Sequence, residues 1–447
     1  MIKKVNMKDA FLEKIEAGTI TIGIIGLGYV GLPLAEAYIR KNTRILGYDI
    51  NQGRVDDLMS GKSGMKHIRN ERVQSLLDSG LFRATSNSEE LKDPDAILIC
   101  VPTPLDEYLQ PDLSNVRATC QILKEIVRPG QIIILESTTY PGTTTDVIKP
   151  ILEESGLKAG VDFAIAYSPE REDPGNPDYD TSSIPKVVGA NSENEHLMAK
   201  AIYEIIVEAV MVSSTRTAEA TKLMENIFRW VNIAMVNELK VIFEHMDIDV
   251  WEVIDAAKTK PFGFMPFYPG PGVGGHCIRI DPYYLTWKAR EFGVSTRFIE
   301  LAGEINIRMP ERVVSRLLEE LSLRYQKALA NSKILLLGIA YKKNIDDMRE
   351  SPSLELITRL RSHGAQVDYY DPYVLTIPKN SQHPNLAGMN SIDWDLQLFE
   401  SYDACLVATD HTDVDYEAIV RAIPLTVDTR NVSKNFFDKY KERVVKA

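Results

Sequence analysis

The sequence has few cysteines, a shortage of basic residues and no long apolar run. Its 447 residues include four cysteines and no Cys-X-X-Cys pair, which excludes a disulfide framework and favours a reducing, cytoplasmic setting. Lys and Arg number 51 against 63 Asp and Glu, so the net charge is −12, which disfavours a broad basic face for nucleic acid. Even with glycine counted as apolar, the longest apolar run, 22–32, is far below the roughly 18 residues of a membrane-spanning helix. The N-terminus also lacks an apolar signal region. Together with the acidic net charge, these features lead us to expect a protein that binds neither nucleic acid nor a membrane.

The chain is long enough for two to four globular domains, at about 100–200 residues each. Residues 1–19 are predicted to form a short amphipathic helix. Short apolar segments then alternate with helical stretches, which predicts right-handed crossovers and a parallel sheet covered by helices on both faces. The predicted strands are 21–25, 45–49, 96–101, 132–137, 163–167 and 186–189.

A different pattern follows residue 212. Residues 215–245 contain neither Pro nor Gly and predict one long helix, and further helices follow to residue 325, interrupted by the Pro/Gly-rich stretch 261–275. Alternation resumes in the segments 333–340, 354–362, 366–370, 404–408 and 425–428. The fold class is therefore α/β, with two doubly wound domains joined by a helical domain that contains a long central helix. We place the domains at 1–212, 213–326 and 327–447.

A glycine motif connects the first predicted strand to the helical stretch 32–40. In Gly26-Leu27-Gly28-Tyr29-Val30-Gly31 the glycines permit a tight turn, the approach of a pyrophosphate to backbone N–H groups, and close helix packing. Asp49 ends the next strand, 23 residues after Gly26, where a carboxylate can accept hydrogen bonds from ribose hydroxyls. The motif predicts NAD rather than NADP, although Arg54 argues weakly for a 2′-phosphate. The alternative is a glycine-rich turn that binds no nucleotide.

The segment 269–282 concentrates glycines before a single cysteine, Cys277. Such a backbone can wrap a ligand closely and present a thiol at its end, which makes Cys277 a candidate nucleophile. An inert buried thiol is the alternative. A metal site formed by His276 and Cys277 is disfavoured, because adjacent ligands without a second Cys/His cluster do not suit zinc, so no metal is expected. The other cysteines, Cys100, Cys120 and Cys405, lie in apolar segments typical of the core.

Two polar side chains share one face of the long predicted helix. Lys222 and Asn226 are four residues apart, about one helical turn. Together they could stabilise an oxyanion beside a thiolate. A solvated helix surface is the alternative interpretation.

Eight segments resemble the UDP-glucose/GDP-mannose dehydrogenase family, in family order from residue 20 to about residue 431. They are GLGYVGLPLA (26–35), VPTP (101–104), ESTTYPGTT (136–144), YSPER (167–171), KLMEN (222–226), GGHCIRID (274–281), AYKKNIDDMRES (340–351) and DTRN (428–431). The resemblance implies an N-terminal Rossmann domain that binds NAD, a central helix that carries a dimer interface, and a C-terminal Rossmann-like domain that binds the UDP-sugar. It also implies two hydride transfers to NAD that oxidise C6 of a nucleotide sugar to a carboxylate, in a homodimer or higher homo-oligomer.

The resemblance assigns chemical roles to six residues. Cys277 becomes the nucleophile that forms a thiohemiacetal and then a thioester, which water cleaves. Lys222 and Asn226 become oxyanion and proton-handling groups, and Asp281 orients Lys222 or water. Glu170 holds or activates the hydrolytic water, and Thr138 lies beside the nicotinamide and that water.

Binding contacts are implied in the same way. For the cofactor they are Gly26, Gly28, Tyr29, Val30, Gly31, Asp49, Arg54, Thr103, Thr138 and Arg349. For the substrate they are Glu170, Arg171, Lys222, Asn226, Phe267, Tyr268, Gly274, Lys342 and Arg430, with Lys342 and Arg430 on the pyrophosphate or uridine. Gly338-Ile339-Ala340 lacks the GxGxxG pattern, so the C-terminal domain should not bind a second dinucleotide.

The residues around the cysteine bear on the choice of sugar. His276 before Cys277 and Ile278-Arg279-Ile280 after it differ from UDP-glucose dehydrogenases. The segments 260–272 and 281–290 resemble bacterial UDP-N-acetyl-D-glucosamine 6-dehydrogenases, which serve O-antigen or capsule synthesis. UDP-N-acetyl-D-mannosamine or UDP-glucose is the alternative substrate. A non-catalytic UDP-sugar-binding protein would not need the full set of site residues, and a 3-hydroxy-acid dehydrogenase would account for less than half of the chain.

Overall fold

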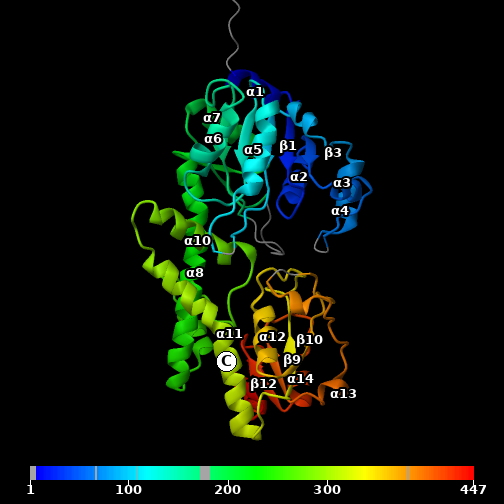
Figure 1. Cartoon of the computed structure of the whole chain (residues 1–447), viewed down its shortest axis with the longest axis vertical. Coiled ribbons are helices and arrows are strands. Elements are labelled where there is room, and N and C mark those ends of the chain that lie inside the picture. The colour runs from blue at the N-terminus through cyan, green and yellow to red at the C-terminus, as the bar shows by residue number, and fades with distance from the viewer. Residues whose placement is uncertain (1–6, 66–67, 107, 172–181, 380–381) are drawn as a thin grey trace, which may run out of the picture. The chain divides into compact units, whose positions relative to one another are not determined.

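The computed structural model describes residues 7–65, 68–106, 108–171, 182–379 and 382–447, except for the side chains of His276 and Cys277 (Figure 1). The chain divides into two compact units. The first comprises Met1–Glu225 with Tyr283–Val294, and the second comprises Asn226–Pro282 with Ser295–Ala447.

The first unit contains an eight-stranded sheet in the order β3-β2-β1-β4-β5-β6-β7-β8. Its first six positions follow the doubly wound order, which places a ligand crevice beyond the carboxyl ends of β1 and β4, where the winding direction reverses. The strands are β1 Thr21–Ile25, β2 Arg44–Tyr48, β3 Phe82–Thr85, β4 Ala96–Ile99, β5 Ile132–Leu135, β6 Ala164–Tyr167, β7 Lys186–Ala190 and β8 Ala209–Val212.

Helices flank this sheet because each has one apolar face. Leu34 and Ala35 of the helix after β1 are fully buried in the same cluster as Ile22, Ile24 and Leu98 of the central strands. The helices are α1 Met7–Glu16, α2 Gly31–Ile39, α3 Gln52–Met59, α4 Asn70–Asp78, α5 Ser114–Ile126, α6 Lys149–Glu153 and α7 Glu193–Tyr203, with a 3-10 helix η1 Ser88–Lys92 and a π-helix η2 Thr143–Ile148.

The second unit contains a five-stranded parallel sheet in the order β10-β9-β11-β12-β13. Its core joins the apolar strands to the C-terminal half of a long helix through Val313, Leu317 and Leu321. The elements are β9 Lys333–Leu337, α12 Pro352–Ser362, β10 Gln366–Tyr370, η3 Pro384–Leu386, α13 Leu396–Phe399, β11 Ala404–Val407, α14 Tyr416–Ala422, β12 Leu425–Asp428, α15 Phe437–Tyr440 and β13 Val444–Lys446.

In the sequence, four further helices follow the last strand of the first sheet and precede the first strand of the second sheet. They are α8 Thr215–His245, α9 Val250–Ala257, α10 His276–Arg290 and α11 Arg297–Tyr325 (Figure 1). The predicted fold class is confirmed, and the long helix α8 has the bounds that the sequence analysis gives it. In the part of the chain that the structure describes, no helix combines the length and apolar character needed to cross a bilayer.

Two features of the sheets differ from the sequence prediction. The strands β3, β8 and β13 are not predicted; all three are edge strands of only three or four residues, which is too short to show a clear periodicity. The pair β6 and β7 is antiparallel, with Tyr167 opposite Gly189, although the alternation predicts parallel strands throughout. Buried strands of either direction have the same apolar composition, so periodicity cannot reveal this reversal.

Candidate active site

The glycine motif forms the turn between β1 and α2. Gly26 has a φ of +92°, and a Cβ there would lie 2.7 Å from the carbonyl oxygen of Cys100. A Cβ on Gly31 would lie 2.0 Å from the oxygen of Gly26, whereas a Cβ on Gly28 would meet no atom within 4 Å. Thus Gly26 makes the turn, Gly31 allows close packing, and Gly28 leaves open space where a pyrophosphate can approach. No side chain caps the N-terminus of α2, so its N–H groups and dipole suit an anion.

Asp49 follows β2 directly and is held by backbone groups. Its Oδ2 accepts a hydrogen bond from the N–H of Leu27 at 3.1 Å, and its Oδ1 accepts one from the N–H of Asn51 at 3.0 Å. Each carboxylate oxygen has a second acceptor position, so both can still accept a ribose hydroxyl. The carboxylate is therefore fixed beside the glycine turn, as a dinucleotide site requires.

Arg54 is engaged by the protein itself. Its Nε and Nη2 donate to the carbonyl of Leu27 at 3.0 and 2.8 Å, and its Nη1 donates to the carbonyl of Ser63. The guanidinium therefore stabilises the glycine turn instead of presenting its donors to a 2′-phosphate. This arrangement favours NAD over NADP.

The loops after β4 and β5 are joined at the same edge of the sheet. Thr103 Oγ1 donates to the carbonyl of Thr138 at 2.8 Å, and Ser137 Oγ donates to the carbonyl of Val101 at 2.7 Å. Tyr284 of α10, fully buried, donates its hydroxyl to the carbonyl of Thr103 at 2.9 Å. The predicted Thr103 and Thr138 are thus brought together, and Tyr284 is a positioning contact that the sequence does not reveal.

The segment after β6 contacts the start of α8. Lys222 is 6% exposed, and its Nζ donates to the carbonyl oxygen of Glu170 at 2.5 Å. Arg171 pairs with Glu225 at 2.7 Å. The alternative of a solvated surface for this helix face is wrong, because Lys222 and Asn226 are both buried. The hydrogen bond of Lys222 offsets the cost of burying its ammonium group. The structure therefore brings the predicted Glu170, Arg171 and Lys222 together within the first unit.

Asn226 contacts α10 within the second unit. It is fully buried, its Nδ2 donates to Asp281 Oδ2, and its Oδ1 accepts from Arg229 Nη2. Asp281 is 2% exposed, so its carboxylate is held in place by this amide. Cys277 is the second residue of α10, one turn before Asp281, and its side chain lies outside the described atoms. A thiolate in the first turn of a helix is stabilised by the helix dipole.

The glycines before Cys277 pack against the second sheet's loops. A Cβ on Gly270 would lie 2.7 Å from Arg430 Nη1, and one on Gly274 would lie 2.6 Å from the Cβ of Tyr341. Gly275, with a φ of +87°, donates its N–H to the carbonyl of Arg349 at 3.2 Å. These glycines therefore permit the loop to approach protein atoms, in addition to the ligand approach that the sequence suggests.

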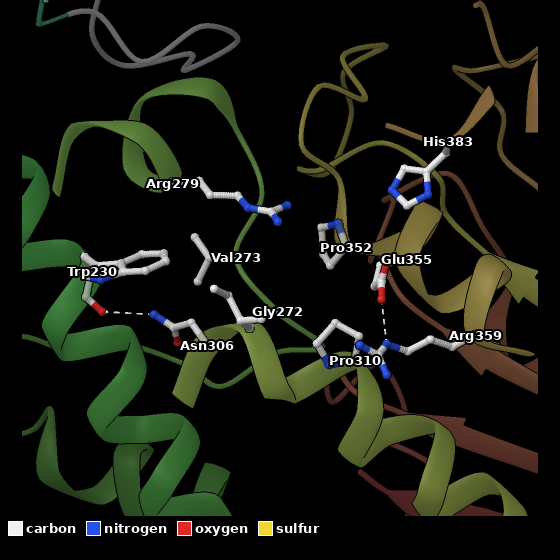
Figure 2. A pocket seen from close by; sticks show the side chains of 11 residues that line it. Trp230, Gly272, Val273, Arg279, Asn306, Pro310, Pro352, Glu355, Arg359 and His383 are labelled. Atoms are coloured by element: carbon white, nitrogen blue, oxygen red, sulfur yellow. Dashed lines mark hydrogen bonds and ion pairs between the residues drawn. The ribbon is translucent and has the colours of Figure 1, made fainter. Parts of the chain in front are cut away.

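A pocket of about 160 Å³ adjoins this loop in the second unit (Figure 2). Figure 2 shows Trp230 and Arg279 on one side of Gly272, and Glu355, Arg359 and His383 on the other. Arg279 pairs with Glu350 at 3.1 Å and Arg359 pairs with Glu355 at 2.6 Å. Both guanidinium groups are therefore already balanced by carboxylates.

The remaining predicted substrate residues have different surroundings. Phe267 packs edge-on against Phe228 with ring centres 5.6 Å apart, and Tyr268 stacks on Trp251 at 5.2 Å. Arg430 donates its Nε to the carbonyl of Ala408 at 2.8 Å. Phe267 and Tyr268 thus contribute to packing on α8 and α9, where the sequence predicts substrate contacts.

Arg349 and Lys342 lie in the loop after β9. The guanidinium of Arg349 is bidentate on Asp347, with Nη2 at 2.6 Å from Oδ2, and the side chain is 44% exposed. Lys342 is half-buried in the same loop.

The second sheet has a counterpart of Asp49 that cannot bind a ribose. Asp371 follows β10 and is fully buried. Its oxygens accept the N–H groups of Ile339, Ala340, Tyr373 and Val374 at 2.6–3.0 Å, and His411 Nε2 lies 3.1 Å away. Because five donors surround two oxygens, no acceptor position remains for a second dinucleotide, in agreement with the absence of the glycine motif.

The sequence does not predict Glu136 and Lys186 as site residues. Lys186 contacts Glu170 directly, and Glu136 contacts Lys186. Lys186 Nζ lies 2.7 Å from Glu136 Oε2 and 2.8 Å from Glu170 Oε2. A lysine at the start of an otherwise apolar strand is the signal that could have identified it, because buried lysines are rare unless paired. No cluster of three metal-ligating side chains occurs within the described ranges.

The chain belongs to the UDP-glucose/GDP-mannose dehydrogenase family. Residues 20–207 match its NAD binding domain, residues 216–308 its central domain and residues 335–435 its UDP binding domain. The family identifies the protein as an NAD-dependent nucleotide-sugar dehydrogenase that acts on a UDP-sugar, as the sequence predicts.

Two of the similar relatives have names that give different substrates. The UDP-N-acetyl-D-glucosamine 6-dehydrogenase of Pseudomonas aeruginosa is 38% identical over 358 residues, which cover 79% of this chain and 83% of that protein. The UDP-N-acetyl-D-mannosamine dehydrogenase of Pyrococcus horikoshii is 35% identical over 424 residues, 92% of this chain and 96% of that protein. The solved structure of the UDP-D-ManNAc dehydrogenase from Pyrococcus horikoshii has a TM-score of 0.82 at 34% identity, with 92% of this chain and 96% of that chain covered.

Proposed function

We propose that the protein oxidises C6 of UDP-N-acetyl-D-glucosamine to the carboxylate of UDP-N-acetyl-D-glucosaminuronate. The observation that carries the chemistry is the buried polar start of α8, where Lys222 bonds to Glu170 and Asn226, one turn later, bonds to Asp281. The choice of sugar is supported by the Pseudomonas aeruginosa relative and by the residues around Cys277. UDP-N-acetyl-D-mannosamine is the second candidate, supported by the Pyrococcus horikoshii enzyme and its structure.

The residues divide the reaction between binding and covalent chemistry. NAD, when bound, accepts a hydride in each of the two oxidations. The glycine turn, Asp49 and the N-terminus of α2 would hold its pyrophosphate and ribose. Lys222 and Asn226 stabilise the oxygen on C6 as negative charge develops on it.

Covalent chemistry begins at Cys277 once C6 is an aldehyde. The thiolate adds to C6, a C–S bond forms, and the carbonyl electron pair moves to oxygen and takes a proton, which gives a thiohemiacetal. Oxidation of that group leaves a thioester. Water then attacks the carbonyl carbon while Glu170 takes a water proton, and the C–S bond breaks with release of the thiolate. The net change is one alcohol to one carboxylate, with two NAD reduced and one water consumed.

We expect two NADH per sugar, with the highest kcat/KM for UDP-N-acetyl-D-glucosamine. NADH release is measured in parallel with UDP-N-acetyl-D-glucosamine, UDP-N-acetyl-D-mannosamine, UDP-N-acetyl-D-galactosamine and UDP-glucose. One NADH per sugar would mean that the reaction stops at the aldehyde and would contradict the thioester mechanism. A higher kcat/KM for the mannosamine sugar would replace the substrate assignment.

The product is an activated uronate donor, which suits the synthesis of bacterial surface polysaccharide such as O-antigen or capsule. A cytoplasmic setting is supported by the three described cysteines, Cys100, Cys120 and Cys405, which are all free thiols.

A homodimer built on α8 is the proposed assembly. Phe228, Met235 and Ile242 recur every seven residues on this helix, and their exposed fractions are 42%, 45% and 43%. Apolar side chains at that spacing form one stripe along a helix, which a second copy can cover. We expect sedimentation to give twice the chain mass, and Met235→Asp to shift the protein to monomer. A monomeric wild-type protein at micromolar concentration would contradict the proposal.

A further inference from the structure

A buried ion cluster joins three strands of the first sheet beside Glu170. We call it the Lys186 cluster; it comprises Glu136, which follows β5, Glu170, which follows β6, Lys186, which begins β7, and Tyr203 of α7. Lys186 is 2% exposed and its Nζ contacts both carboxylates, at 2.7 and 2.8 Å. Tyr203 donates its hydroxyl to the other oxygen of Glu136. One cation thus holds two acids together at the carboxyl ends of β5 and β6.

The cluster has one cation, Lys186, for two carboxyl groups, Glu136 and Glu170. Glu136 and Tyr203 are almost fully buried, so an unpaired ion there would be costly. Burial alone would lower the pKa of Lys186, but Glu136 and Glu170 more than offset this and keep its pKa above the usual value, so it stays an ammonium. Burial raises the pKa of Glu136, with Lys186 opposing the rise and Glu170 adding to it. Ionisation of either acid therefore disfavours ionisation of the other.

Glu170 differs from Glu136 in being less completely buried. Its side chain is 14% exposed, its Oε2 faces Lys186, and its Oε1 accepts the N–H of Arg171 at 2.7 Å. Its carbonyl oxygen accepts from Lys222 Nζ. The carboxylate is therefore anchored from the interior by Lys186 and remains accessible at its surface side.

We propose that Lys186 is a positioning residue for Glu170: it fixes the carboxylate and keeps it ionised, so that Glu170 can take a proton from the water that cleaves the thioester. This inference rests on the proposed function. The water proton moves to Glu170, the hydroxide oxygen bonds to the thioester carbon, and the sulfur of Cys277 leaves with the C–S electron pair. Glu136 weakens the effect of Lys186 on the ionisation of Glu170, because it shares the cation.

Three ionisable groups in or beside the cluster stay neutral over the working range. Burial raises the pKa values of Tyr38 and Cys100 well above normal, and also that of Tyr203, so all three stay neutral. Among the described residues, the cations Arg171 and Lys222 also adjoin Glu170, and Arg171 is paired with Glu225. The acid limb of the pH profile of thioester hydrolysis should therefore report the ionisation of Glu170, which Lys186 favours and Glu136 disfavours.

The test compares Lys186→Met with Glu136→Gln, which should act in opposite directions. Loss of the cation disfavours ionised Glu170, so Lys186→Met should move the acid limb of hydrolysis upward by about one pH unit. Loss of the competing carboxylate favours ionised Glu170, so Glu136→Gln should move that limb downward. Lys186→Arg keeps the charge and should restore most of the wild-type profile.

Transient kinetics give the second readout. When hydrolysis slows by roughly 10²-fold in Lys186→Met, NADH should appear as a burst of two per site followed by a slow phase, and intact mass should show the sugar on Cys277. Lys200→Met is the matched control, because Lys200 pairs with Glu204 on the exposed face of α7, and it should leave burst and profile unchanged.

The proposal would be overturned if the acid limb moved in the same direction in Lys186→Met and Glu136→Gln, or if it moved in neither variant. If Lys186→Met does not fold, an upward or absent shift in Glu136→Gln still contradicts it. A wild-type protein that releases no NADH with any of the four UDP-sugars would instead refute the proposed function, so the two failures are distinguishable.

Discussion

Replacing Cys277 by alanine is expected to reduce formation of the sugar acid by about 10⁴-fold or more, with near wild-type binding of NAD and the UDP-sugar. Alanine removes the sulfur that forms the thiohemiacetal and thioester, but it leaves the glycine turn and the second sheet intact. The position at the start of α10 supports the role, because the helix dipole favours the thiolate there. Acid production is measured by chromatography of the nucleotide sugar, and binding by calorimetry.

The matched control is Cys120→Ala in α5. Cys120 is fully buried in the core, and burial raises the pKa of its thiol to about 12, so it cannot supply a thiolate at neutral pH. This variant should retain its turnover, with a lower melting temperature from the small cavity. Equal acid production by Cys277→Ala and wild type would contradict covalent catalysis.

Replacing Lys222 by methionine is expected to lower kcat by roughly 10²–10³-fold, with a smaller change in KM. Methionine has a similar length but no donor, so the developing negative charge on the substrate oxygen loses its cation. The same change removes the 2.5 Å hydrogen bond to the carbonyl of Glu170, which also weakens the positioning of that carboxylate. Steady-state kinetics with the preferred UDP-sugar measure both parameters.

Lys240→Met provides a control on the same helix. Lys240 is as buried as Lys222, at 6% exposure, and burial lowers its pKa to about 8. It lies 18 residues further along α8, so its loss should affect stability without lowering kcat to the same extent. Similar kcat values for Lys222→Met and wild type would remove Lys222 from the chemistry.

Part of the candidate site follows from local sequence requirements. The glycine turn and Asp49 are recognisable because a left-handed φ at Gly26, a close contact at Gly31 and a carboxylate at a strand end are conditions on single positions. The presence of a long helix is predictable because residues 215–245 contain neither Pro nor Gly. The resemblance of short segments then identified the family, which matching of all three domains confirmed. The domain bounds and the roles of the individual site residues stay predictions.

The sequence by itself thus determined the class of enzyme, its cofactor and the order of its elements, because these depend on local motifs and periodicity. Only the tertiary structure decided which polar and charged groups, distant in the sequence, contact one another. Lys186 meets Glu136, 50 residues away in the sequence, since β5, β6 and β7 are neighbours and β7 runs antiparallel to β6. Asn226 meets Asp281 across 55 residues, and Arg54 engages the glycine turn instead of a phosphate. Such pairings depend on the adjacency and direction of strands and helices, which composition and spacing do not encode.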